Sequence, residues 1–258
     1  MGRVETFELD IAPLGQSPRT IYAYLPNDYD TSKKTYPVLY MFDGHNLFDN
    51  ATATYGKSWG IREYLEQNDI PLVVIGQDCN HTGYSRLGEY CPLPVRDSEW
   101  FPDIPTSGEI TAEWFVNTLK PECEKRYRIR RDRKHVGIGG SSMGGLMSMY
   151  CVTKYNSVYS KAACVSSSMD ICLDSLLDLI AGSEILPSTR IYLDFGSNEV
   201  KRKSSFARCV DNLLRLNHAW SEKGAKTYPH IVVDGMHSEA SWETIVPVFI
   251  QYLYPELF

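Results

Sequence analysis

Alternating and continuous apolar patterns predict strands in the first third of the chain. The segments "ETFELDIA" (5–12) and "RTIYAYLP" (19–26) alternate between apolar and polar positions, as half-buried strands do. The runs "YPVLYMFD" (36–43) and "PLVVIGQD" (71–78) are apolar throughout, which favours strands buried on both faces. Between these two runs, "SWGIREYLEQ" (58–67) has the apolar spacing of a helix.

The next segment, residues 79–106, has no clear periodicity and is rich in Gly, Pro, Asn and aromatic residues. Irregular stretches of this length are usually functional or disordered. Thr106 and Glu109 then have the spacing of a capping box, which predicts a helix through "ITAEWFVNTLK" (110–120). Pro121 marks the predicted kink or end of that helix.

Strands and helices alternate strictly in the second half. Predicted strands are followed by predicted helices in four successive units, over 134–140 and 143–155, 161–168 and 170–182, 189–196 and 205–224, and 226–235 and 241–254. Such alternation predicts βαβ crossovers, and therefore an α/β fold with a mostly parallel central sheet and helices on both faces. We expect one domain over residues 1–258, without a separate lid domain.

Charge and hydropathy exclude several classes of protein. A net charge of −6 argues against nucleic acid as a partner, and the basic segment 125–134 is interrupted by Tyr, Ile and Asp. No apolar run is long enough to cross a membrane, and the N-terminus lacks the apolar core of a signal peptide. We therefore expect a cytoplasmic protein with no membrane partner; nothing in the sequence sets its oligomeric state.

The cysteines indicate neither a disulfide framework nor a zinc site. There are seven, an odd number, and none forms a C-x-x-C pair. Because they are scattered through apolar runs, we expect them to be small buried hydrophobic residues in a reducing compartment. No metal is predicted.

One motif carries chemistry. Within "GIGGSSMGGLMSMY" (137–150), Gly140, Ser142 and Gly144 fit the pattern G-x-S-x-G, in which a serine nucleophile sits on a sharp turn between strand and helix. The motif is short, but here a predicted strand ends before it and a predicted helix begins after it. A phosphate-binding loop is disfavoured, since no Lys follows the glycines.

A serine nucleophile needs a base, and the base needs an orienting acid. In this kind of fold the acid and then the base follow later strands. Glu199 and His237 both lie just after predicted strands, in that order. Asp170, which follows an earlier strand, stays open as an alternative acid, as does a dyad without an acid.

The loop after the third predicted strand, "DGHNLFD", is expected to complete an oxyanion hole. Gly44 permits a tight turn there, and the backbone N–H groups of His45 and Met143 are predicted to face the developing oxyanion. Residues of the long loop are candidates to line the pocket, although the aromatic ones suit a purely structural role equally well; they are Tyr84, Tyr90, Trp100, Phe101 and His81.

With these residues assembled, the chain resembles the esterase D-like family of α/β-hydrolases, which includes feruloyl and acetyl-xylan esterases, S-formylglutathione hydrolases, siderophore esterases and mycolyltransferases. The resemblance rests on "YPVLYMFDGHNLFD", "RLGEYCP", "GIGGSSMGGLMSMY", "IYLDFGSNE" and "GMHSEASW". It implies the α/β-hydrolase fold, Ser142 as nucleophile, His237 as base and Glu199 as acid. Many members have Asp where this chain has Glu199. Near the pocket entrance, Arg86, Glu89 and Tyr90 are expected to be structural rather than substrate contacts.

The resemblance further implies a serine carboxylesterase that hydrolyses small acyl esters, such as acetyl or feruloyl esters of carbohydrates, through an acyl-enzyme. No cofactor is required for this chemistry. Two alternatives stay open. The same scaffold serves acyltransferases, and a catalytically silent homologue would bind a ligand without turnover. Damage to the serine, base or acid would indicate the silent homologue, and the sequence carries none.

Overall fold

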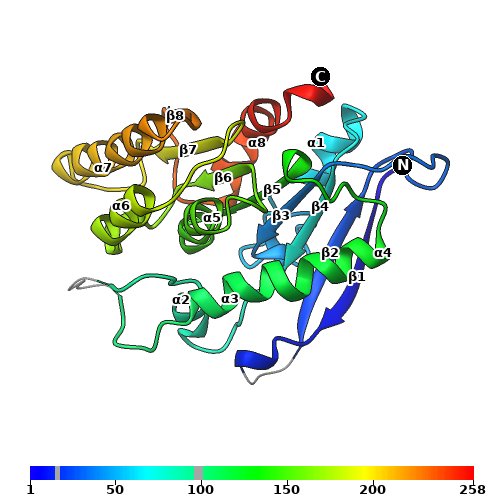
Figure 1. The fold of residues 1–258 in the computed structure, drawn as a ribbon, viewed down its shortest axis with the longest axis horizontal. Helices are drawn as coiled ribbons and strands as arrows, with labels where there is room; N and C mark the ends of the chain where they lie inside the picture. The colour runs from blue at the N-terminus through cyan, green and yellow to red at the C-terminus, as the bar shows by residue number, and fades with distance from the viewer. Residues whose placement is uncertain (15–17, 96–100) are drawn as a thin grey trace.

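A mixed sheet forms the centre of the molecule. The computed structural model describes residues 1–14, 18–95 and 101–258, and within them eight strands form one sheet in the order β1-β2-β4-β3-β5-β6-β7-β8 (Figure 1). Strands β1 and β2 pair antiparallel, β2 pairs antiparallel with β4, and every later pair is parallel. The predicted α/β fold with a mostly parallel sheet is confirmed.

The strands follow the apolar runs closely. Their bounds are β1 Arg3–Leu9, β2 Arg19–Leu25, β3 Val38–Phe42, β4 Val73–Gln77, β5 Val136–Ser141, β6 Lys161–Val165, β7 Arg190–Gly196 and β8 Lys226–Val232. Strands β3, β4, β5 and β6 are buried at every position, because helices cover both of their faces. Their carboxyl ends meet at one edge of the sheet, where ligands bind in open α/β folds.

Helices cover the sheet from two sides. One core packs α3, α4, α5, α6 and α7 against the sheet, and the other packs α1 and α8. The bounds of these helices are α1 Ile61–Gln67, α3 Gly108–Trp114, α4 Lys120–Arg126, α5 Met143–Lys154, α6 Leu173–Gly182, α7 Lys203–Glu222 and α8 Glu239–Leu253. This two-sided cover is the arrangement that alternating strands and helices predict.

The helix predicted before Pro121 continues past it. A π-helical turn, Phe115–Leu119, joins α3 to α4, and Pro121 is the second residue of α4. The wider turn accommodates the missing proline N–H, so the helix continues without a break. The predicted capping box is wrong. Ser107 is the N-cap without a side-chain cap, and the Glu109 carboxylate instead accepts a hydrogen bond from the Tyr150 hydroxyl at 3.0 Å.

The segment 79–106 is less irregular than predicted. A short helix, α2 Ser85–Glu89, lies within it, while residues 96–100 fall outside the described part of the chain. The carboxylate of Glu89 accepts two hydrogen bonds from the buried Arg19 guanidinium, both at 2.9 Å. This pair fastens α2 to β2, and it confirms the structural role expected of Glu89.

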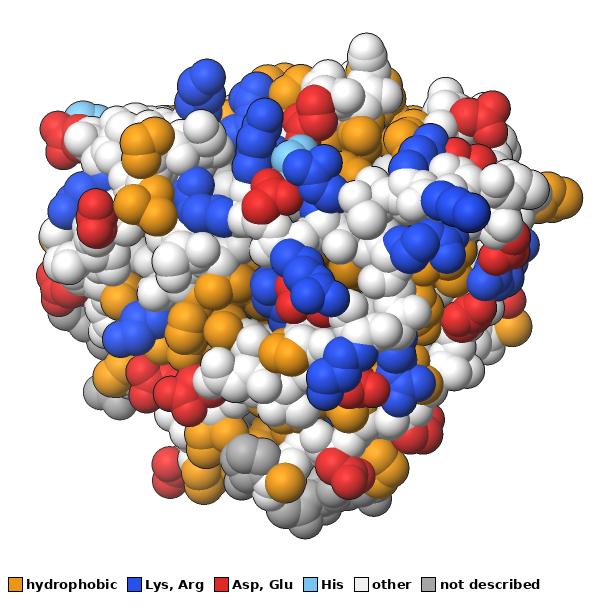
Figure 2. Space-filling view, turned by 45° about the vertical axis from the view of Figure 1, so that its right-hand side comes forward, with side chains coloured by type: hydrophobic (Ala, Val, Ile, Leu, Met, Phe, Trp, Pro, Cys, Tyr) orange, Lys and Arg blue, Asp and Glu red, His pale blue; other side chains and the backbone are white. Residues whose placement is uncertain are grey.

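The cysteines are free and buried, as expected. Among the described residues, no helix combines the length and the apolarity needed to cross a membrane. Basic and acidic side chains intermingle over the face shown in Figure 2. Within the basic segment 125–134, Arg126 pairs with Glu122 and Arg130 with Asp132.

Candidate active site

Ser142 occupies a strained turn between β5 and α5. Its backbone angles are φ 57° and ψ −120°, in a region that non-glycine residues rarely adopt. The turn is held at both of its peptide groups: the Ser142 N–H donates to the carbonyl of Val165, and its carbonyl accepts from the Ser168 N–H, each at 3.0 Å. The Ser142 hydroxyl lies 3.3 Å from that of Ser168. These contacts hold the Ser142 backbone in its strained conformation.

Close backbone packing explains the two glycines of the motif. A Cβ atom on Gly140 would lie 2.9 Å from the backbone of Gly144, and one on Gly144 would lie 2.9 Å from the Cβ of Phe42. Real Cβ atoms are not found this close to their neighbours. Any side chain at either position would push α5 away from β3 and β5, and would move Ser142 with it.

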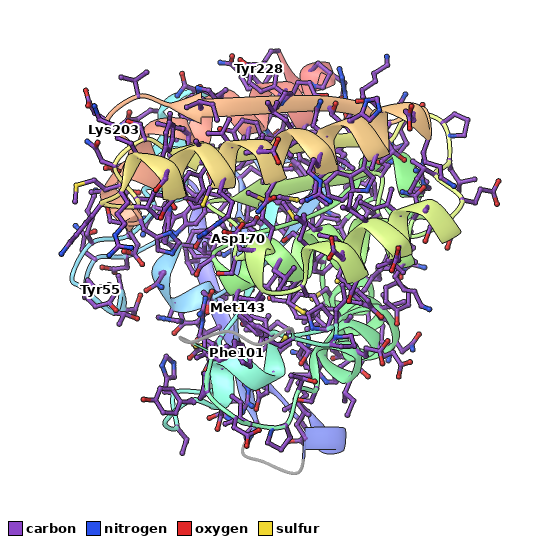
Figure 3. All side chains as sticks on the ribbon, turned by 90° about the vertical axis from the view of Figure 1, so that its left-hand side faces the viewer. Tyr55, Phe101, Met143, Asp170, Lys203 and Tyr228 are labelled. Atoms are coloured by element: carbon purple, nitrogen blue, oxygen red, sulfur yellow. The ribbon has the colours of Figure 1, made fainter. Side chains whose placement is uncertain are left out.

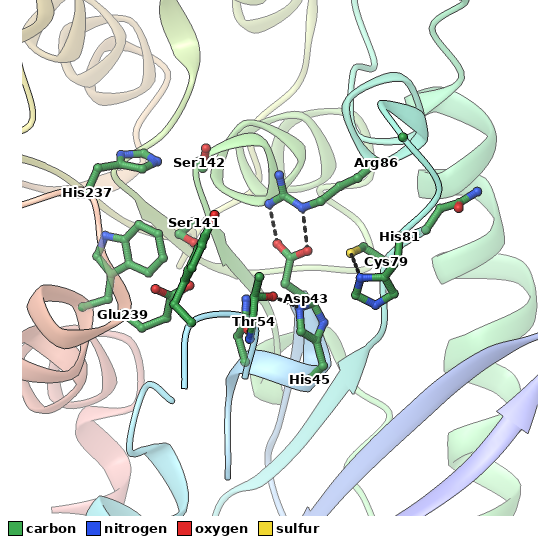
Figure 4. Close-up of a pocket in the computed structure, with 15 residues that line it drawn as sticks. Asp43, His45, Thr54, Cys79, His81, Arg86, Ser141, Ser142, His237 and Glu239 are labelled. Carbon is green, nitrogen blue, oxygen red and sulfur yellow. Dashed lines mark hydrogen bonds and ion pairs between the residues drawn. The ribbon is translucent and has the colours of Figure 1, made fainter. Parts of the chain in front are cut away.

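His237 and Glu199 meet beside this turn. Imidazole Nδ1 lies 2.8 Å from Glu199 Oε2, which leaves Nε2 available on the opposite side of the ring. The two side chains differ in exposure, because Glu199 is 3% exposed and His237 is 42% exposed. Figure 4 shows the His237 ring beside Ser142 on one wall of a pocket. The loops after β7 and β8 thus bring Glu199 and His237 together, the two residues that the sequence predicts as acid and base from their order along the chain.

The second carboxylate oxygen of Glu199 is anchored separately. Oε1 accepts hydrogen bonds from the hydroxyl of Ser166 at 2.8 Å and from the N–H of Gly196 at 2.5 Å. The indole N–H of Trp242 donates to the same hydroxyl at 2.9 Å, and the Trp242 ring also packs edge-on against His237 at 5.2 Å. Trp242 therefore helps to position both residues: Glu199 through the Ser166 hydroxyl, and His237 by ring packing.

Asp170, the alternative acid, lies elsewhere. Its carboxylate accepts hydrogen bonds from the Asn212 amide at 2.9 Å and from the Cys209 thiol at 3.5 Å, both on α7. Arg208 is 3.7 Å from it. Asp170 therefore joins α7 to the segment after β6 and makes its contacts there, away from His237.

Asp194, on β7, is a second buried carboxyl near the site. It accepts hydrogen bonds from the Ser166 N–H at 2.7 Å and the Tyr192 hydroxyl at 2.8 Å. Burial raises the pKa of Asp194 to about 7, and the nearby charge of Glu199 adds to this shift, while its two hydrogen bonds oppose it. Asp194 and Glu199 thus share Ser166 as a donor.

The two predicted oxyanion donors are in the first turns of helices. Met143 opens α5, and His45 lies in the 3₁₀-helix Gly44–Asn46 that follows β3; backbone N–H groups at such positions lack helical acceptors. Both residues are buried. Gly44 permits this turn by its lack of a side chain, because a Cβ there would lie 2.6 Å from Gly76. The left-handed residue of the turn is Asp43, with φ 58°.

A pair that the sequence did not predict fixes this loop. The Asp43 carboxylate accepts two hydrogen bonds from Arg86, 2.7 Å from Nε and 2.6 Å from Nη2 (Figure 4). Burial alone would lower the pKa of Arg86, but the charge and hydrogen bonds of Asp43 outweigh it and raise that pKa. Arg86 also lies over the ring of Tyr90, 5.1 Å from its centroid. This pair gives Arg86 a structural contact, and Arg86 also lines the pocket over Ser142.

A pocket of about 430 Å³ opens over Ser142 and His237. His81 lines it, as predicted, and so do residues that the sequence did not single out, among them Tyr55, Glu239 and Trp242. Tyr55 is 81% exposed and stands at the edge of the molecule in Figure 3, whereas Met143 lies nearer the middle. The only sequence signal for Glu239 is its place in "HSEASW", next to the predicted base.

Two predicted lining residues do not line this pocket. Tyr90 is fully buried, and its hydroxyl donates to Gln77 at 2.8 Å, so it belongs to the core. Tyr84 is 64% exposed and lines a neighbouring pocket with Ile104. Trp100 lies outside the described residues, and Phe101 packs partly buried against the core.

Comparison with known proteins identifies the family. A family model described as "Putative esterase" matches residues 14–249. The chain belongs to this esterase family. The resemblance deduced from the sequence is thereby confirmed, and the chain is assigned to the carboxylic ester hydrolases.

Individual relatives are distant in sequence. YbbA of Bacillus subtilis is 29% identical over 210 residues, covering 80% of this chain and 79% of YbbA. Esterase MT1326 of Mycobacterium tuberculosis is 26% identical over 161 residues, which is 62% of this chain but only 31% of that protein. A solved ferulic acid esterase superposes with a TM-score of 0.72 at 17% identity, covering 100% of this chain and 99% of the other. This superposition establishes the shared α/β-hydrolase fold.

Proposed function

We propose that this esterase is a serine carboxylesterase in which Ser142, His237 and Glu199 act as nucleophile, base and acid. One observation carries the proposal: His237 Nδ1 is held by Glu199 at 2.8 Å, so Nε2 is free to face the pocket that Ser142 also lines. A carboxylate on Nδ1 fixes the imidazole tautomer and stabilises the imidazolium that forms during catalysis.

The reaction proceeds in two acyl-transfer steps. Nε2 of His237 takes the proton of the Ser142 hydroxyl as its oxygen attacks the ester carbonyl carbon, and the N–H groups of His45 and Met143 stabilise the oxyanion. The C–O bond to the alcohol then breaks, and the alcohol leaves with the proton from His237. Water repeats these steps on the acyl-enzyme, which releases the acid and restores Ser142. None of these reaction steps requires a cofactor.

The pocket supports a small acyl group esterified to a hydroxyl-bearing alcohol, such as a sugar. Glu239 is 5% exposed and lines the pocket, and its carboxylate has no hydrogen bond or ion pair to any described residue. A carboxylate in that position accepts strong hydrogen bonds from sugar hydroxyls. Free, buried thiols throughout the chain support work in a reducing compartment, the cytoplasm.

Hydrolysis of chromogenic acyl esters, from acetyl to feruloyl, tests the proposal. We expect Ser142→Ala to lower kcat by about four to six orders of magnitude, as loss of a triad serine does. Ser141→Ala is the matched control, since Ser141 is the adjacent serine and lines the same pocket. Equal activity in Ser142→Ala and wild type would refute the assignment. Turnover that appears only when an acyl acceptor other than water is added would instead indicate an acyltransferase.

A further inference from the structure

A second group of reactive side chains lies at the carboxyl ends of β3 and β4. His45 follows β3, while Asp78, Cys79 and His81 follow β4. The two strands are parallel neighbours with Phe42 beside Gln77, so the segments after them emerge together. One ligand atom from each of the four side chains lies within 4.8 Å of all the others.

Contacts within this group converge on one carboxylate oxygen. Asp78 Oδ1 lies 2.6 Å from His45 Nδ1 and 2.9 Å from His81 Nε2. The Cys79 sulfur lies 4.0 Å from His81 Nδ1 (Figure 4). Asp78 therefore places one carboxylate oxygen between two imidazoles.

His45 presents a buried nitrogen without a hydrogen bond. Its side chain is 7% exposed, and Nδ1, although close to Asp78, does not meet hydrogen-bond geometry with any described group. The other nitrogen, Nε2, lies 2.9 Å from the Thr54 hydroxyl. In a metal-bound form the ring proton would lie on Nε2 and be donated to Thr54, and the Nδ1 lone pair would face the ion instead of Asp78. Metal-binding histidines are commonly oriented by such a hydrogen bond from the other nitrogen.

We propose that His45, Asp78, Cys79 and His81 form a binding site for a divalent transition-metal ion of the zinc class. Two imidazoles, one carboxylate and one thiolate are the donor set that zinc takes in four-coordinate sites. Bonds of about 2.0 to 2.3 Å to such donors place neighbouring ligand atoms about 3 to 4 Å apart. The two Asp78–imidazole distances are shorter than this spacing and the widest separation, up to 4.8 Å, is longer. Asp78 and the exposed His81 would therefore both rotate when the four atoms bind one ion.

Zinc binds a thiolate and not a thiol, so the ion would displace the proton of Cys79 to solvent. The site is distinct from the Ser142–His237–Glu199 group, although His45 and His81 line the same pocket. Its existence does not depend on the proposed esterase mechanism, because it can be measured by binding alone.

The chain offers a matched control for an ordinary His–Asp contact. His135 and Asp132 form a pair near the surface, with Nδ1 and Oδ1 2.5 Å apart. Among the described residues, neither a cysteine nor a second histidine binds to this pair. A His–Asp hydrogen bond alone does not bind zinc tightly. His135→Ala therefore removes an imidazole of similar setting without touching the proposed site.

Metal-stripped protein is titrated with Zn²⁺ alone and, separately, with Co²⁺ as a spectroscopic probe. We expect one ion per chain, a tetrahedral cobalt spectrum with a thiolate charge-transfer band, and affinity at least about tenfold weaker in His81→Ala. His135→Ala should bind as wild type does. His81→Gln is a second variant, and circular dichroism verifies that both His81 variants are folded.

Other results would overturn the whole proposal or the role of one ligand. Equal zinc affinity in wild type and His81→Ala, or no binding in wild type, would overturn the site. A cobalt spectrum that depends on His81 but is unchanged in Cys79→Ser would remove Cys79 from the ligand set. Because these readouts are stoichiometry and absorption, inactive protein still reports on the metal site, and a failed esterase assay does not affect the outcome.

Discussion

Arg86 holds Asp43 through two parallel hydrogen bonds, and Asp43 is the left-handed residue two positions before His45. The position of the predicted oxyanion donor therefore depends on an arginine in another part of the chain. Lys at position 86 would keep the charge but lose the paired geometry. We expect Arg86→Lys to lower kcat by about tenfold or more, since each oxyanion donor contributes more than that. Steady-state kinetics on an acetyl ester measure this; an unchanged kcat would separate Arg86 from the oxyanion hole.

Glu199 is anchored at Oε1 by Ser166 and Gly196 while Oε2 contacts His237. Glu199→Gln removes the charge that stabilises the imidazolium, and we expect kcat to fall by about four orders of magnitude. The side chain in Glu199→Asp is one methylene shorter, so its carboxylate cannot reach both His237 and the donors Ser166 and Gly196. This variant should lose part of the activity. Asp170→Asn is the control. A larger loss in Asp170→Asn than in Glu199→Gln would reverse the assignment of the acid.

Glu239 is expected to act on the alcohol part of the substrate. Glu239→Gln weakens charge-assisted hydrogen bonds to hydroxyls, so KM for an acetylated sugar should rise about five- to tenfold. KM for p-nitrophenyl acetate, which has no hydroxyl on its leaving group, should change little. Glu243→Gln, on the same helix but paired with Lys57, is the control. Equal changes for both substrates would indicate a structural role.

Asp194 should make the free energy of unfolding depend on pH. Because its pKa is about 7 when folded, against an ordinary 3.8, the folded chain keeps a proton that the unfolded chain has released between about pH 4 and pH 7. The contribution of Asp194 to stability therefore decreases as pH rises through this window, and levels off above it. Urea unfolding across pH should show a smaller decrease in Asp194→Asn. Identical pH profiles would mean that Asp194 is ionised throughout.

The sequence predicts those parts of the fold and the site that are encoded by residues close together in the chain. Ser142 and the strand before it are encoded within one short segment, and so are the apolar runs of β3 to β6. Glu199 and His237 follow from their order after strands, and the structure brings them together; their catalytic roles stay predictions. Tyr90 is in the core, which fits the structural role expected of it and not the lining role. The sequence offers both roles, because an aromatic residue in a loop gives the same signal whether it faces a pocket or the core.

Other features required three dimensions. The Asp43–Arg86 pair joins residues 43 positions apart, and no local pattern connects them. The proposed metal site is also formed by residues distant in sequence, since its ligands follow two different strands. They lack the C-x-x-C spacing whose absence led to the expectation of no metal. The capping box failed because Tyr150, distant in sequence, supplies the hydrogen bond that Glu109 accepts.

The central claim is that Ser142 is the nucleophile activated by His237. The most direct measurement is reaction with a fluorophosphonate, followed by peptide mapping of the adduct. We predict one adduct per chain, on Ser142, with labelling abolished in Ser142→Ala and greatly slowed in His237→Ala. An adduct on Ser141, or ester hydrolysis by protein that the reagent does not label, would contradict the account.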